Sequence, residues 1–198
     1  MTNDSGTSKE IYIIAGPNGA GKTTFSYGLI DEGFISHFVN ADEIAKEISR
    51  TKLGLHKDFN AGRLMLTTLD ILSEGTDSFA FETTLSGVSY LHRIRNWRSQ
   101  GWVVNLYYLF VRDVSVSINR VAERVAHGGH DIPVDDIQRR YGKSLSNLME
   151  RFITEVDYVE CILNDQEIPQ TIFKAYQGDV YEQHPILFPI FQNKVASR

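Results

Sequence analysis

The stretch EIYIIAGPNGAGKTTF at residues 10–25 decides the fold of this chain. Its first six residues, EIYIIA, form a short and mostly apolar run with three Ile and one Tyr, which is typical of a buried strand. The glycine-rich turn that follows meets the P-loop spacing G-x-x-x-x-G-K-S/T, with Gly16, Gly21, Lys22 and Thr23 at the fixed positions. The residues after Lys22 suit a helix. Because strand, loop and helix stand in the order that the motif requires, the sequence predicts a phosphate-binding site here.

The P-loop also predicts which groups hold the phosphates. Glycines let backbone N–H groups converge on an anion, and the N-terminus of the helix adds the positive end of its dipole. Lys22 would reach the β- and γ-phosphates, and the Thr23 hydroxyl would be a magnesium ligand. Asn18 suits a turn former as well as a binding residue. The predicted nucleotide-binding residues are Gly16, Pro17, Asn18, Gly19, Ala20, Gly21, Lys22, Thr23 and Thr24.

Strand and helix patterns alternate along the rest of the chain. Asn40 and Glu43 have the capping-box spacing of a helix start, and apolar residues step by three and four through 58–74, 114–125 and 137–152. Further strands are predicted at 34–39, 78–82, 103–111 and 156–163. Such alternation favours a parallel sheet. We predict an α/β protein, a three-layer α/β/α P-loop NTPase fold with a mostly parallel central sheet and a helical lid.

The two ends of the chain have their own character. The polar segment 1–9 is expected to be disordered, with a single domain over 10–198. In the C-terminal tail we predict one more short strand, and we expect Pro185 and Pro189 to limit any terminal helix. The single cysteine, Cys161, stands in an apolar run and is interpreted as an inert core thiol.

Composition excludes several classes of protein. The 198 residues are 42% hydrophobic, which is enough for one core. Twenty Lys and Arg against twenty-five Asp and Glu give a net charge of -5, which argues against a nucleic-acid partner. No uninterrupted apolar run of ~18 residues and no signal peptide is found, so we expect a soluble, cytoplasmic protein without a membrane partner.

The remaining sequence narrows the type of P-loop protein. The base reader Asn-Lys-x-Asp of GTPases is not met, because the Asn-Lys pair at 193–194 is followed by Val-Ala. The signature of ABC-type ATPases is broken after Leu-Ser-Gly at 85–87. The strand at 103–111 is followed by a single Asp113 and not by the carboxylate pair of a motor-type ATPase, and Asp113 suits a helix N-cap. What remains is a small-molecule kinase that uses ATP and Mg²⁺ on a hydroxyl-bearing acceptor.

Polar residues follow two predicted strands at the sheet edge where α/β proteins bind ligands. Asp42 could accept the proton of an attacking hydroxyl, or it could simply stabilise the first turn of a helix. Glu82, Thr83 and Thr84 could hold substrate hydroxyls, or they could form an ordinary strand-end turn.

A basic lid is predicted between residues 114 and 152. Arg120, Arg124 and His127 share one helical face, which is often only a solvated face. The loop GGH at 128–130 and then Arg139 and Arg140 add further cations beyond a flexible joint, and arginines on a closing lid suit a transferring phosphoryl group. His127 and His130 with Asp131 are too few ligands to favour a metal site.

Five segments in order, GPNGAGKTT, VNADEIA, FETTLSG, NRVAERVAHGGHDIP and RRYGKSLSNL, resemble the zeta toxin family of P-loop kinases, in particular its single-domain bacterial branch. The resemblance spans residues 11–147. It implies phosphorylation of a hydroxyl of UDP-N-acetylglucosamine with ATP and magnesium, and an antitoxin protein as a partner that blocks the nucleotide site.

The resemblance also implies roles for single residues. Lys22 and Thr23 match the P-loop lysine and magnesium ligand, Asp42 the general base, and Glu82 and Thr84 the groups that hold the substrate sugar. Two lid arginines match Arg120 or Arg124 and Arg139 or Arg140. The chain departs from the best-studied toxins in the substrate pocket, where ETTLSG replaces a glycine after the glutamate, and in its GGH loop. A regulatory protein that binds and hydrolyses ATP, and a kinase with another acceptor, remain as alternatives.

Overall fold

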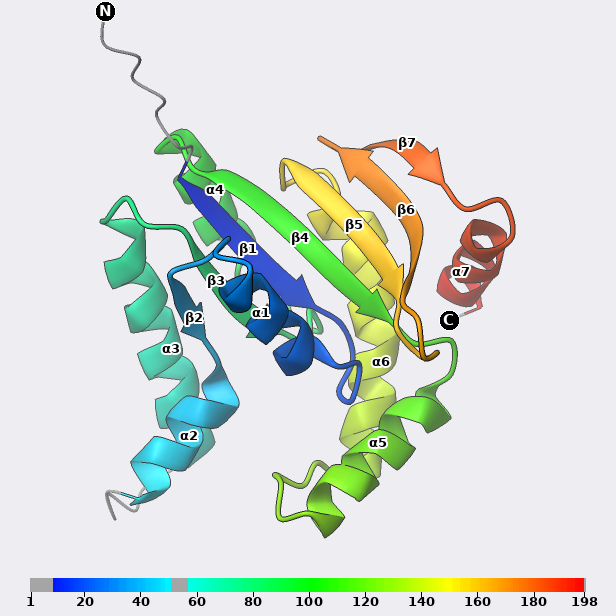
Figure 1. Cartoon of the computed structure of the whole chain (residues 1–198), viewed down its shortest axis with the longest axis horizontal. Helices are drawn as coiled ribbons and strands as arrows, with labels where there is room; N and C mark the ends of the chain where they lie inside the picture. Colours follow the sequence, from blue (N-terminus) through cyan, green and yellow to red (C-terminus); the bar gives the residue numbers. More distant parts are fainter. Residues whose placement is uncertain (1–8, 51–56, 198) are drawn as a thin grey trace, which may run out of the picture.

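A twisted sheet of seven strands forms the centre of the molecule (Figure 1). The computed structural model describes residues 9–50 and 57–197, so the predicted disordered segment 1–9 lies outside the described residues except for Lys9. The strand order is β2-β3-β1-β4-β5-β6-β7. The first five strands in this order are parallel, and β6 and β7 are antiparallel additions at one edge. The strands are β1 Glu10–Ala15, β2 His37–Val39, β3 Phe79–Thr83, β4 Val103–Phe110, β5 Tyr158–Leu163, β6 Gln170–Tyr176 and β7 Asp179–Gln183.

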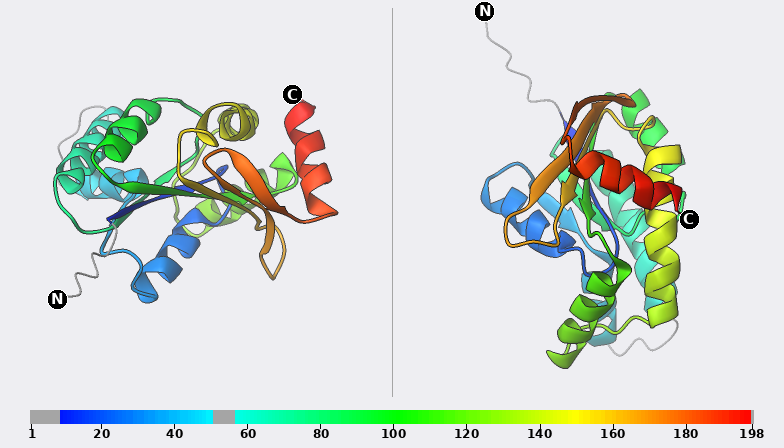
Figure 2. Two further views of the ribbon diagram at one scale, coloured as in Figure 1. Left: turned by 90° about the horizontal axis from the view of Figure 1, so that it is seen from above. Right: turned by 90° about the vertical axis from the view of Figure 1, so that its right-hand side faces the viewer.

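Helices cover both faces of this sheet. The views in Figures 1 and 2 place α1 on one face and α3, α4 and α6 on the other, with α7 beside α6. The helices are α1 Lys22–Asp31, α2 Ala41–Arg50, α3 Lys57–Ser73, α4 Leu91–Ser99, α5 Val114–Ala126, α6 Val134–Asn147 and α7 Leu187–Ala196, and a π-helical turn at Leu148–Phe152 extends α6. The predicted three-layer α/β/α fold with a mostly parallel sheet is confirmed.

The core explains why β1 is apolar on both sides. Ile11 and Ile13 are fully buried in the larger cluster, which lies under α3, α4 and α6. Tyr12 and Ile14 belong to a smaller cluster on the face of α1. Successive strand residues point to opposite faces, so a central parallel strand has no solvent side. Burial of each isoleucine stabilises the fold by roughly 1.5–3 kcal/mol. This strand therefore anchors the P-loop to the middle of the molecule.

Cys161 lies in the same core, as predicted. It is fully buried on β5, and burial raises the pKa of its thiol well above the ordinary value. A neutral, inaccessible thiol is a poor nucleophile.

Several strand boundaries differ from the sequence prediction by one to three residues, among them the strand predicted at 103–111, which ends at Phe110. The strand predicted at 34–39 is formed only from His37, because Gly33 adopts φ +78° and the Phe34 N–H donates to Leu29 O (3.0 Å), which closes the end of α1. Ser78 precedes β3, which starts at Phe79 and runs on to Thr83. Val156 is still held by the preceding helical turn, so β5 starts later than predicted.

The structure of the C-terminal tail also differs from the prediction. Two strands are present, β6 and β7, where one was expected. Helix α7 runs from Leu187 to Ala196 with Pro189 inside it, so the expectation that Pro189 limits a terminal helix is wrong. Pro189 is the third residue of the helix, where a backbone N–H would have no intrahelical partner, so its missing donor costs little there. Among residues 9–50 and 57–197, no helix is long and apolar enough to cross a membrane.

Candidate functional site

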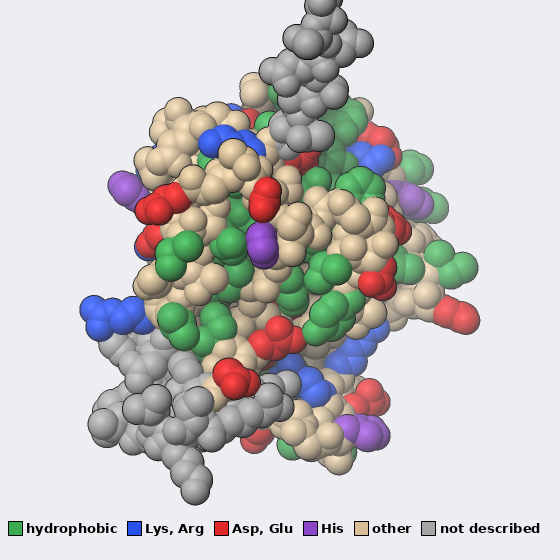
Figure 3. All heavy atoms as spheres, turned by 60° about the vertical axis from the view of Figure 1, so that its left-hand side comes forward, with side chains coloured by type: hydrophobic (Ala, Val, Ile, Leu, Met, Phe, Trp, Pro, Cys, Tyr) green, Lys and Arg blue, Asp and Glu red, His purple; other side chains and the backbone are tan. Residues whose placement is uncertain are grey.

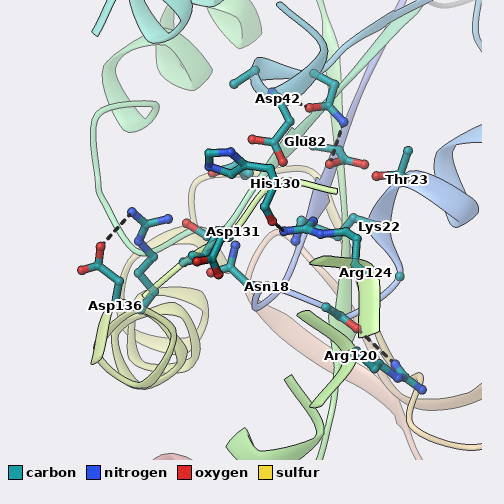
Figure 4. Close-up of a pocket in the computed structure, with 18 of the residues that line it drawn as sticks. Asn18, Lys22, Thr23, Asp42, Glu82, Arg120, Arg124, His130, Asp131 and Asp136 are labelled. Atoms are coloured by element: carbon teal, nitrogen blue, oxygen red, sulfur yellow. Dashed lines mark hydrogen bonds and ion pairs between the residues drawn. The ribbon is translucent and has the colours of Figure 1, made fainter. Parts of the chain in front are cut away.

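A cavity of about 640 Å³ lies where the carboxyl ends of β1, β2 and β3 meet the lid formed by α5, α6 and the loop between them. Figure 4 shows its polar side chains converging from these elements. Its lining includes thirteen residues predicted as site residues: Asn18, Gly19, Gly21, Lys22, Thr23, Thr24, Asp42, Glu82, Thr83, Thr84, Arg120, Arg124 and Arg140. This is the edge of the sheet at which α/β proteins bind ligands.

The P-loop forms the floor of the cavity. Gly16, Pro17 and Ala20 are buried beneath it and do not line it. Lys22 opens α1 and folds back over the loop, where its ammonium donates to Gly16 O (3.0 Å) and Pro17 O (2.9 Å). A Cβ at position 16 would lie 2.4 Å from Leu109 O, so only glycine lets the loop pass this close to β4.

Two residues from distant parts of the chain support the P-loop from behind. Asn164, directly after β5, donates from Nδ2 to Ala20 O (2.7 Å). Arg120 donates from Nη1 to Gly19 O (3.2 Å) and to Asn164 O (2.8 Å). Sequence reasoning missed Asn164, and the only signal for it is a polar residue at the end of a buried strand. Arg120, predicted to contact phosphate, is thus placed against the loop backbone.

Asn40 connects the start of α2 to the Glu82 carboxylate. It is 7% exposed; its Oδ1 accepts from the Asp42 N–H (2.8 Å) and caps α2, while its Nδ2 donates to Glu82 Oε2 (3.1 Å). The predicted capping-box partner does not act as one, because Glu43 accepts a hydrogen bond from the Tyr27 hydroxyl (2.9 Å). Asp42 is exposed in the first turn of α2 and, in Figure 4, its carboxylate points into the cavity.

The turn after β3 holds the two predicted threonines. The Thr83 hydroxyl accepts from the Leu85 N–H (3.1 Å), and the Thr84 hydroxyl shares a hydrogen bond with Ser86 (2.9 Å). Leu85 is fully buried with φ +56°, a strained conformation for a residue with a side chain. Asn147 on α6 donates to Leu85 O (2.8 Å), so the lid helix holds this turn in place.

The lid brings further charged groups to the cavity. Arg124 on α5 donates from Nη2 to His130 O (2.8 Å) and lies opposite the P-loop lysine. His130 and Asp131, which sequence reasoning rejected as metal ligands, line the cavity. Of the predicted pair on α6, Arg140 lines the cavity and lies 3.6 Å from Asp136, whereas Arg139 is half exposed, pairs with Asp136 at 2.7 Å and stays outside the lining.

Burial and charge act in opposite directions at the centre of the site. Lys22 keeps some exposed surface, but burial of its ammonium lowers its pKa, while the Glu82 and Asp42 carboxylates act to raise it. Burial raises the pKa of Glu82, and the nearby Lys22 ammonium and Thr23 hydroxyl oppose that rise. Figure 3 shows acidic and basic side chains gathered at the lower edge of the molecule, where Figure 1 places α2 and α5. The site is therefore a polar cavity of mixed charge.

Comparison with known proteins gives consistent results. A family model described as Zeta toxin matches residues 1–172. A curated protein of Haemophilus influenzae, described as uncharacterized, is 30% identical over 129 residues, which cover 65% of this chain and 90% of that protein. The identity is high enough, over enough of that protein, to indicate common descent.

Solved structures share the fold at low sequence identity. The AvrRxo1-ORF1:-ORF2 complex with ATP has a TM-score of 0.74 and 14% identity over 96% of this chain, which spans 64% of that chain's length. The PezAT chromosomal toxin-antitoxin system of Streptococcus pneumoniae has a TM-score of 0.56 and 16% identity, over 96% and 88% of the two chains. A gluconokinase from Sinorhizobium meliloti has a TM-score of 0.51 and 13% identity, over 96% and 90%. Because the family model covers most of the sequence, this chain belongs to the zeta toxin family.

Proposed function

We propose that this protein is an ATP-dependent phosphotransferase of the kinase type, which transfers the γ-phosphoryl group to a hydroxyl of UDP-N-acetylglucosamine or a related nucleotide sugar. The observation that carries the proposal is the meeting of a P-loop, a carboxylate and lid arginines around one cavity. Membership of the zeta toxin family supports the kinase type. The fold neighbour that was crystallised with ATP supports the nucleotide.

Each part of the cavity has a task in this reaction. Backbone N–H groups of the loop and the Lys22 ammonium hold the β- and γ-phosphates. Mg²⁺, bound with the nucleotide through Thr23, would neutralise phosphate charge. Asp42 takes the proton of the acceptor hydroxyl, whose oxygen then bonds to the γ-phosphorus as the bond to the β-phosphate oxygen breaks, and ADP leaves. Arg124 and Arg140 offset charge on the transferring group.

The acceptor would lie on the β3 side of the cavity. Glu82, Thr83 and Thr84 are the polar residues there, and the family resemblance assigns Glu82 and Thr84 to the sugar. A partner protein belongs to the proposal as well, because the PezAT structure is described as a toxin-antitoxin system. We infer an antitoxin that covers the nucleotide site.

The test is a product assay. Purified protein is incubated with Mg-ATP and UDP-N-acetylglucosamine, and mass spectrometry measures acceptor that is heavier by one phosphoryl group. Asp42→Asn should retain ATP affinity and lose transfer by roughly a hundredfold or more, the usual size of a general-base contribution. Asp31→Asn, an exposed residue at the end of α1, is the matched control and should transfer normally.

Each other outcome points to a different reading. Full transfer by Asp42→Asn would remove Asp42 from the role of base. ATP loss at the same rate with and without any acceptor would favour a regulatory protein that hydrolyses ATP. ATP binding without product would reject UDP-N-acetylglucosamine and leave other hydroxyl acceptors to be screened.

A further inference from the structure

One oxygen of the partly buried Glu82 carboxylate makes no regular hydrogen bond within the described part of the protein, although the Thr23 hydroxyl acts on the group to lower its pKa. Its Oε2 accepts a hydrogen bond from Asn40 Nδ2 (3.1 Å). Its Oε1 is buried and has no hydrogen-bond partner among the residues that the structure describes. A buried carboxylate oxygen without a partner is costly, so such a group is expected to meet a cation or a donor when the site is filled.

The direction of this oxygen indicates which ligand it meets. In Figure 4 the Glu82 carboxylate and the Thr23 hydroxyl point toward each other across a small space at the floor of the cavity. Lys22 is next to both, but its ammonium donates to two carbonyl groups of the P-loop. Thr23 is the P-loop residue whose hydroxyl binds the metal ion of a bound nucleotide. Glu82 therefore faces the nucleotide's metal position, on the P-loop side of the cavity.

The donor set fits a magnesium ion that arrives with its nucleotide. The described residues contain no group of three or more His, Cys, Asp or Glu side chains that could hold a metal by themselves. Mg²⁺ rarely uses an all-protein cage: it keeps several waters and takes one or two side-chain oxygens together with phosphate oxygens. Thr23 and one free carboxylate oxygen match this requirement.

We propose that Glu82 binds the hydrated Mg²⁺ of the nucleotide, with Asn40 as the positioning residue that turns its free oxygen toward Thr23. This inference rests on the proposed function, but it gives Glu82 a different task from the sugar contact that the family resemblance implies. The two assignments separate experimentally, because a metal-binding residue acts before any acceptor is present.

The experiment measures nucleotide affinity without acceptor. ATP binding to wild type, Glu82→Gln and Glu43→Gln is titrated calorimetrically, once with Mg²⁺ and once with EDTA. Glu82→Gln removes the charge at nearly constant volume, and Glu43→Gln is the matched control, since Glu43 is exposed and lies outside the cavity lining. In Glu82→Gln we expect the gain in affinity from Mg²⁺ to fall about tenfold, the lower end for loss of a supporting metal contact, with unchanged affinity in EDTA.

A second readout follows the metal itself. Mn²⁺ bound with ATP is monitored by electron paramagnetic resonance, and Glu82→Gln should weaken its binding while Glu82→Asp, which keeps the charge, should restore part of it. Asn40→Ala should weaken it in the same direction, because the carboxylate loses its support. Circular dichroism of each variant verifies folding.

The results distinguish this inference from the proposed function. If Glu82→Gln binds Mg-ATP and Mn²⁺ as wild type does and raises only the KM for the acceptor, Glu82 is a sugar ligand and the inference is wrong. If wild type itself does not bind ATP in either buffer, the proposed function is what fails.

Discussion

Gly21 provides a direct test of how the P-loop is held in place. Its φ of +87° is left-handed, which costs a residue with a Cβ about 1–2 kcal/mol. A Cβ there would also lie 2.6 Å from Asn164 Nδ2. Gly21→Ala should therefore strain the loop and push the amide away from Ala20 O, with the loss of a hydrogen bond worth about 1 kcal/mol. We expect the free energy of unfolding to fall by about 2–3 kcal/mol.

The same hydrogen bond can be removed from the other side. Asn164→Ala deletes it without strain and should cost about 1 kcal/mol. In the double variant the clash is absent and the hydrogen bond is lost only once. Independent effects of Gly21→Ala and Asn164→Ala would add to about 3–4 kcal/mol, whereas we expect about 2–3 kcal/mol, a coupling of about 1 kcal/mol that is usual for residues in contact.

Thermal denaturation of the four proteins without nucleotide measures this coupling, since 1 kcal/mol shifts Tm by roughly 2–4 °C at this chain length. Gly33→Ala combined with Asn164→Ala is the control cycle. Gly33 also has a left-handed φ, +78°, but nothing lies within 4 Å of an added Cβ, so its effect should add to that of Asn164→Ala. Strict additivity in the Gly21 cycle as well would refute the contact between Asn164 and the loop.

Three further predictions concern charge. Lys22→Ala should weaken ATP binding tenfold or more in calorimetry, because a charge-assisted contact to phosphate is worth about 1.5–3 kcal/mol; unchanged affinity would make the P-loop structural only. Arg140→Met should slow phosphoryl transfer and Arg139→Met should not, since only Arg140 lines the cavity, and equal rates would contradict this difference. The hydrogen bond from Arg95 lowers the pKa of Glu155 below its unfolded value of 4.5. The ion pair therefore stabilises the fold above pH 4.5, and this stabilisation is lost as the pH falls through the lower folded pKa. Glu155→Gln should then lower the free energy of unfolding in urea denaturation at pH 7, and this cost should shrink as the pH falls below 4.5; a cost that does not change with pH would show packing, not charge.

The helices and strands were predictable where apolar residues recur at the spacing of a helix, every three or four residues, or fill a short run that suits a buried strand. Residues 11–15 are apolar on both faces because β1 is central, and Ala61, Met65 and Leu69 are buried along one side of α3 as their spacing predicts. Strand β7 carries no such signal, because all five of its residues are exposed and only its pairing with β6 makes it a strand. Pro189 misled the prediction because its effect depends on its position within the helix.

The site was predictable as a set of motifs and not as a set of contacts. Lys22 and Asp42 lie in the first turns of the helices that follow β1 and β2, Glu82 lies at the end of β3, and a parallel sheet brings these strand ends to one edge. Asn164 lies 144 residues from the Ala20 carbonyl that it binds, so no local pattern could reveal it. Asn40 has a local signal, but that signal indicates a helix cap and says nothing of its second contact with Glu82.

The sequence left open whether Arg120 or Arg124 contacts the phosphate, and the tertiary contacts of the two arginines distinguish them. Arg120 already donates to Gly19 O and Asn164 O, so moving it toward a phosphate would break support for the P-loop. Arg124 has a buried Nε without a partner among the described residues, and a phosphate oxygen would satisfy that donor. Its Nη2 also holds His130 O, so the arginine and the lid loop should move together. We therefore expect Arg124 to carry the phosphate contact on α5 and Arg120 to keep the loop in shape for it.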